Sequence, residues 1–155
     1  MSAPAPAAWH PGPPLWQLVL LAFAGGLAGS GFRAMAEVAA AAIEAPGWTA
    51  RIFVNLTGAF LIGLLFATLC RLDAQGRPDG IPHGARLREH LLGAGFLGGF
   101  TTISGFSWDA AVALNQGDAR RMGILLACNG LLGIVAAAFG YWLAMRARLR
   151  RQGAG

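Results

Sequence analysis

Charge is scarce in this sequence, and lysine is absent altogether. Only 12% of the 155 residues are charged and 55% are hydrophobic, whereas about 25% of the residues of a typical soluble domain are charged. Apolar stretches of roughly the 20 residues that a helix needs to cross a bilayer take up most of the chain. These features exclude a large soluble domain and indicate a membrane protein.

The basic residues are all arginine, twelve of them against seven acidic residues, which leaves a net charge of +5. An excess of positive charge can indicate a nucleic-acid partner. Here, however, the arginines lie at the ends of hydrophobic runs, as anchors at lipid head groups do. We therefore expect membrane lipid around this chain and no nucleic acid.

Cysteine and histidine are few and scattered. Cys70 and Cys128 lie in apolar surroundings without a CxxC spacing, so we expect small buried side chains. His10, His83 and His90 show no metal-ligand spacing, and no nucleophile–base pair can be assigned. The sequence therefore predicts that the protein is not an enzyme.

Four hydrophobic runs predict four transmembrane helices, over 15–38, 50–69, 91–114 and 123–145. Short turns follow the first and third runs, and a Gly/Pro-rich loop follows the second. The fold class is thus an all-α membrane protein with its transmembrane domain over 15–145. Residues 1–14 are rich in proline and alanine, lack a basic n-region and predict a disordered leader. Residues 146–155 predict a basic, solvated C-terminal tail.

The distribution of arginine predicts an orientation. Eight arginines lie in the middle loop and the tail: Arg71, Arg77, Arg86, Arg88, Arg146, Arg148, Arg150 and Arg151. The other side has Arg51, Arg120 and Arg121, with Arg33 in or at the end of the first helix. Because cytoplasmic loops carry the excess of basic residues, this pattern places both termini and the middle loop in the cytoplasm.

Glycine is abundant, with 23 residues. Gly25 with Gly29, and Gly95 with Gly99, have the GxxxG spacing that lets helix backbones approach closely in lipid. We expect these positions to pack helices together.

The most informative stretch is 95–107, in the middle of the third run, where a Gly98–Gly99 pair precedes four hydroxyl side chains. They belong to Thr101, Thr102, Ser104 and Ser107. Adjacent glycines allow the helix to break, and irregular backbone is tolerated in a membrane only where it is buried in protein or lines a cavity. The alternative is an unbroken helix whose hydroxyls bond back to the carbonyl four residues earlier.

Two polar residues in other runs also require partners. Asn55 is costly in lipid and should face the bundle interior, where it either donates to an anion or ties two helices together. Arg33 either raises the anion concentration at a pore mouth or extends to the head groups.

Taken together, these residues resemble the CrcB/Fluc family of fluoride channels. The first-helix pattern GG..G...R is met by Gly25, Gly26, Gly29 and Arg33, and the second-helix pattern VN..G.F..G by Val54, Asn55, Gly58, Phe60 and Gly63. The third-helix pattern G..GG.TT.S.FS is met from Gly95 to Ser107. The resemblance covers about residues 16–145.

The resemblance implies an antiparallel dimer in the bacterial inner membrane, with two fluoride pores at the subunit interface. Asn55, Ser104, Phe106 and Ser107 match pore positions, and Ile103 stands where a second pore phenylalanine is usual. A central Na⁺ would be held by backbone carbonyls at the positions of Gly98 and Thr101. Arg33 and Asp109 match vestibule positions, with Asp109 in place of a common Glu, while Gly105 replaces a common Thr and Ala59 a common Ser.

Three alternatives stay open. The arginine bias favours one orientation, so the partner is either a second copy or an oppositely oriented homologous chain. A small multidrug transporter would need a carboxylate in mid-membrane, and Asp109 lies past the centre of its run. A non-conducting assembly protein would explain the glycines but not the hydroxyl-rich segment.

Overall fold

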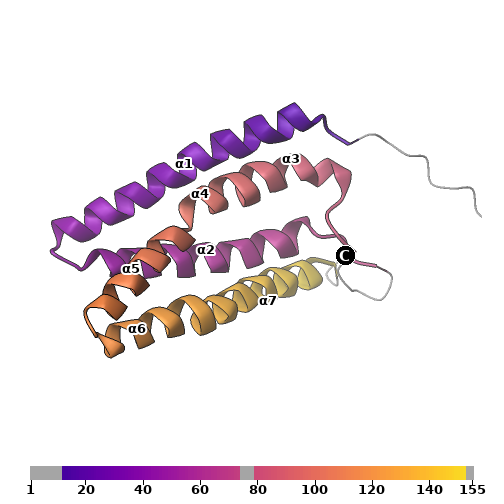
Figure 1. Cartoon of the computed structure of the whole chain (residues 1–155). Helices are drawn as coiled ribbons and strands as arrows, with labels where there is room; N and C mark the ends of the chain where they lie inside the picture. The colour runs from indigo at the N-terminus through magenta and orange to yellow at the C-terminus, as the bar shows by residue number, and fades with distance from the viewer. Residues whose placement is uncertain (1–11, 74–78, 153–155) are drawn as a thin grey trace, which may run out of the picture.

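The computed structural model describes residues 12–73 and 79–152, and this part of the chain is built almost entirely from helices (Figure 1). The first two are α1 (Leu15–Ala42) and α2 (Gly47–Leu69). Each follows a proline, Pro14 or Pro46, whose missing N–H costs nothing at a helix start. The expected tight turn joins α1 to α2.

A 3₁₀ turn, η1 (His83–Ala85), and the short α3 (Arg86–Arg88) precede the third hydrophobic run. The run itself is covered first by the π-helical η2 (Glu89–Leu97) and α4 (Gly98–Phe100). It resumes as α5 (Ile103–Asn115). The fourth run is continuous and comprises α6 (Ala119–Leu126), the π-helical η3 (Ala127–Leu132) and α7 (Gly133–Gln152).

The third run is interrupted, but not at its glycine pair. Gly98 and Gly99 are helical, and the extended residues are Thr101 (ψ 159°) and Thr102 (φ −146°, ψ 111°). Gly99 is instead used for packing, since a Cβ there would lie 2.9 Å from the Cα of Gly26. The break falls three residues later than the glycine pair suggests, where β-branched side chains favour extended backbone.

Glycine contacts join α1 to η2 and α4, which lie side by side in Figure 1. A Cβ on Gly29 would lie 2.8 Å from the amide nitrogen of Phe100, and a Cβ on Gly95 would lie 2.8 Å from the carbonyl oxygen of Ala22. These distances are too short for any real Cβ. The predicted close approach of the two GxxxG segments is therefore confirmed, and they pack against each other.

A second glycine contact joins α2 to α7, which are also neighbours in Figure 1. A Cβ on Gly63 would lie 2.8 Å from the carbonyl carbon of Ala137, and one on Gly140 would lie 3.0 Å from that of Phe60. The described residues thus form two closely packed helix pairs, with α2 lying between the two outer helices α1 and α7.

Three helical stretches in the described residues are long and apolar enough to cross a membrane: Leu15–Ala42, Gly47–Leu69 and Ala119–Arg151. The third run is not among them because its helix is interrupted. Most of the expected basic tail is helical: α7 continues to Gln152, and Arg148 donates to the carbonyl oxygen of Cys70 (2.7 Å) at the end of α2. Residues 1–11 of the leader and 153–155 of the tail lie outside the described residues.

Candidate functional site

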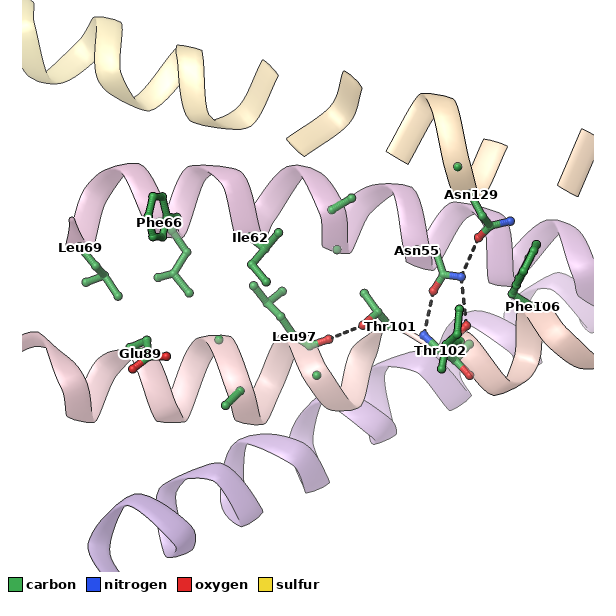
Figure 2. A pocket seen from close by; sticks show the side chains of 18 of the residues that line it. Asn55, Ile62, Phe66, Leu69, Glu89, Leu97, Thr101, Thr102, Phe106 and Asn129 are labelled. Atoms are coloured by element: carbon green, nitrogen blue, oxygen red, sulfur yellow. Dashed lines mark hydrogen bonds between the residues drawn. The ribbon is translucent and has the colours of Figure 1, made fainter. Parts of the chain in front are cut away.

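An open groove of about 840 Å³ lies between α2 and the third run. Its walls are largely apolar, with Ile62 on α2 opposite Leu97 (Figure 2). Phe66 and Leu69 lie toward one end, where Glu89 is the charged lining residue. The uncharged polar side chains gather at the opposite end, where the helix break lies. This end of the groove is lined by Asn55, Gly98, Thr101, Thr102, Ile103, Phe106, Asn129 and Gly130.

Asn55 holds the break in place. Its Oδ1 accepts a hydrogen bond from the Thr102 amide (2.8 Å), and its Nδ2 donates to the Thr102 carbonyl oxygen (3.1 Å). The same Nδ2 donates to the Oδ1 of Asn129 (2.8 Å; Figure 2). Buried backbone groups require such partners, and Thr102 is only 9% exposed. In the single chain Asn55 therefore ties α2 to both the break and η3, one of the two roles considered for it.

Asn129 extends this network to the fourth run. Its Nδ2 donates to the carbonyl oxygen of Leu125 (3.0 Å), which fixes the amide toward Asn55. Asn129 is not among the site residues predicted from the sequence. The signal was present, because an amide inside an apolar run is as costly without a partner as Asn55 is.

The hydroxyl groups near the break are largely engaged within the chain. Thr101 and Ser107 donate to the carbonyls of Leu97 (2.8 Å) and Ile103 (2.9 Å), four residues earlier in each case. Thr102 caps α5 by accepting from the amide of Gly105 (3.0 Å). Ser104 lies 3.2 Å from the Thr102 hydroxyl and, like Ser107, is exposed but does not line the groove.

The carbonyl groups at the end of α4 face an arginine from α1. Arg33 donates to the carbonyl oxygen of Thr101 (3.1 Å), and Ser30 donates to that of Gly99 (3.4 Å). A cation is favourable there because a helix C-terminus carries partial negative charge. Arg33 thus turns inward to the break instead of extending to the head groups. Gly98 is exposed at the groove.

The aromatic positions differ in their surroundings. Phe106 lines the polar end of the groove and is partly covered, and Figure 2 shows it close to Asn55 and Asn129. Ile103 also lines the polar end of the groove, and its side chain is 78% exposed. The structure thus brings these two positions to the same groove as Asn55.

Asp109 lies outside the groove, in a buried ion-pair cluster. It is 1% exposed, and its two oxygens accept from the Nε and Nη2 of Arg51, each at 2.6 Å. Arg121 donates to the Oδ1 at 3.2 Å and lies over the ring of Trp48. Neither arginine is predicted from the sequence as a partner of Asp109, although a carboxylate inside an apolar run predicts a cationic neighbour.

The sequence is similar to known proteins over most of its length. The family model described as CrcB-like protein, Camphor Resistance (CrcB), matches residues 20–141. A fluoride-specific ion channel FluC of Hyphomonas neptunium is 36% identical over 128 residues, or 82% of this chain and 94% of that protein. Its counterpart in Xanthomonas euvesicatoria is 36% identical over 142 residues, or 86% of this chain and 98% of that protein. The chain belongs to the CrcB family.

Proposed function

We propose that this protein is a fluoride-selective, passive ion channel of a bacterial plasma membrane that exports cytoplasmic fluoride and so confers fluoride resistance. The observation that carries the proposal is the match, over nearly their whole length, to relatives named fluoride-specific ion channels. The groove supports it, because irregular backbone and amide side chains are found within a membrane where they line a cavity.

Fluoride is small and strongly hydrated, so a pore must replace its water with strong hydrogen-bond donors. The start of α5 offers the amide groups of Ile103 and Ser104, which precede the capped amide of Gly105, together with the positive end of the helix dipole. The ring edge of Phe106 is positive and suits an anion. Ile103 has no such edge, so aromatic contacts come from one position of the two.

Asn55 would act by exchange. Both hydrogen bonds from its Nδ2 are satisfied within the chain, so an approaching anion takes the place of Asn129. We expect the bond to Thr102 to persist and to keep the amide oriented toward the ion.

Two copies would assemble in opposite orientations, each covering the groove of the other and forming two pores. The physical argument is the cost of leaving Asn55, Thr102 and Asn129 beside lipid on an open face, since polar groups exposed to hydrocarbon are unfavourable. The third run would cross the membrane in addition to the three continuous helices. Its α4 and α5 would together span the bilayer, with the break between them.

A structural Na⁺ would suit the centre of such a dimer. Hard cations bind oxygen ligands, and the break leaves the carbonyl of Gly98 at the end of a helix, exposed at the groove. The carbonyl of Thr101 already accepts from Arg33 but retains a second lone pair. When bound, the ion would supply a positive field that favours anions in both pores.

Purified protein in liposomes loaded with fluoride tests the channel directly. We expect rapid fluoride release, read with a fluoride electrode, and chloride retention in matched vesicles. Fluoride retention equal to that of empty vesicles would contradict conduction and favour a non-conducting assembly protein. Chloride release at a similar rate would contradict selectivity.

The orientation of the subunits needs a separate test. Reporters active only in the periplasm or only in the cytoplasm, fused to the C-terminus, should both give signal if one chain inserts in two orientations. Signal from a single reporter would indicate that the partner is an oppositely oriented homologous chain.

A multidrug exchanger would need a carboxylate free to bind protons and cations. Asp109, the acidic residue within the third apolar run, is instead buried between two arginines, and no observation favours that function.

A further inference from the structure

Arg51 connects the two helices that carry Asn55 and Phe106. It lies in α2 four residues before Asn55, which is about one helical turn. Its guanidinium binds both carboxylate oxygens of Asp109 at 2.6 Å. Asp109 lies in α5 three residues after Phe106, again about one turn. The ion pair therefore joins α2 to α5 one turn away from both groove residues.

Gly105 makes room for this connection. A Cβ added to it would lie 2.6 Å from the Cδ of Arg51 and 2.9 Å from the Cγ2 of Thr102. Gly105 and Asp109 are four residues apart and share one face of α5. The stem of Arg51 thus runs over Gly105 and ends at Asp109. Any side chain larger than that of glycine at position 105 would therefore collide with Arg51 in its present position.

The contact is bidentate, a geometry that the planar guanidinium group provides and an ammonium group does not. Arg121 contributes a single, longer contact to the same carboxylate (3.2 Å). Removing Arg51 therefore does not leave Asp109 as an isolated buried charge, so the loss of Arg51 can be studied in a folded protein.

We propose that Arg51 is a positioning residue, which, accommodated by Gly105 and held by Asp109, sets the place of Phe106 relative to Asn55 at the polar end of the groove. The inference rests on the proposed channel function. It assigns a role in setting pore geometry to an ion pair outside the groove. The spacing of Asn55 and Phe106 would then depend on the length and planarity of the Arg51 side chain.

The first test is the unitary fluoride current of single channels in planar bilayers. Because even a shift of about 1 Å loosens a functional site, we expect Arg51→Lys, which keeps the charge but loses the bidentate contact, to lower that current at least about threefold. Arg120→Lys, at an exposed neighbour of Arg121, should leave it unchanged. A role in stability alone would reduce the number of active channels without changing the current of each.

The second test is a double-mutant cycle. Gly105→Ala should lower the unitary current in the wild-type background, because the new methyl group displaces Arg51. In an Arg51→Ala background the same change should have less than about half that effect, since contacting residues are not additive. Gly31→Ala, where a Cβ would meet nothing within 4 Å, is the matched glycine control.

The outcomes separate this inference from the proposed function. If the wild-type protein conducts fluoride and Arg51→Lys has the wild-type unitary current, the positioning role is refuted while the channel stands. Additive effects of Gly105→Ala and Arg51→Ala would also refute it. If the wild-type protein passes no fluoride current, both the channel and the positioning role are wrong.

Discussion

Replacing Asn55 by alanine should loosen the helix break. The change removes three hydrogen bonds, two with the peptide groups of Thr102 (2.8 and 3.1 Å) and one with Asn129 (2.8 Å). At about 0.6 to 1 kcal/mol for each bond within a membrane protein, the expected loss of unfolding free energy is about 2 to 3 kcal/mol. Thr102 is 9% exposed, so water will not fully replace these partners.

The assay combines equilibrium unfolding in mixed detergent micelles with fluoride release from liposomes. Asn129→Ala is the matched comparison, because it removes the bond to Asn55 and its own bond to Leu125 but leaves Thr102 satisfied. We expect it to cost about 1 to 2 kcal/mol, and less than Asn55→Ala. Fluoride release should fall markedly for Asn55→Ala.

Asn55→Asp sharpens the test. The carboxylate can still accept from the Thr102 amide, but it cannot donate to the Thr102 carbonyl oxygen or to Asn129, and its charge opposes an anion. We expect release to fall at least as far as in Asn55→Ala. A difference of less than about 0.5 kcal/mol between the unfolding free energies of Asn55→Ala and the wild type would be smaller than the contribution of a single hydrogen bond. That result would refute the role of Asn55 in holding the break.

Three further predictions concern other parts of the molecule. Gly29→Ala should disrupt the contact of α1 with the third run, because its Cβ would meet the backbone of Phe96 and Phe100. The unfolding free energy should fall by at least about 2 kcal/mol, and a fall of less than about 0.5 kcal/mol would contradict the close packing. Phe106→Ala should lower fluoride release, while Cys70→Ala, remote from the groove's polar end, should not; equal release from both variants would remove Phe106 from the pathway. Arg148→Gln removes the hydrogen bonds to the carbonyl oxygens of Ala67 and Cys70 and should weaken the attachment of α7 to the end of α2. We expect a loss of about 1 kcal/mol of unfolding free energy, measured by the same micelle titration. An unchanged unfolding free energy would show that these two carbonyl oxygens find other donors.

The helix interruption shows where local sequence reasoning reaches its limit. The Gly98–Gly99 pair and the Thr101–Thr102 pair are both plausible positions for a break. Which one is used depends on Asn55, which lies 47 residues from Thr102 in the sequence and satisfies both of its peptide groups. Gly98 and Gly99 stay helical, and Gly99 packs against Gly26 of α1.

Local sequence patterns likewise do not identify the hydrogen-bond and ion-pair partners of polar residues in the apolar runs. The resemblance places Asp109 at a vestibule position, and the structure pairs it with Arg51, 58 residues away. Asn129 was not singled out, and its contact with Asn55 spans 74 residues. In both cases the cost of an unpaired polar group in lipid predicted that a partner exists, but not which residue it is.

The sequence by itself determined the membrane location, the four hydrophobic runs, the close approach of the GxxxG segments and the resemblance to a channel family. These follow from properties of short segments, namely hydrophobic length, glycine spacing and motif order. The tertiary structure alone decided where the third helix breaks, which residue satisfies the peptide groups of Thr102 at the break, and which arginines neutralise Asp109. Those outcomes depend on which side chains meet in space, and the pairing of polar groups far apart in the chain is not encoded in any single stretch of it.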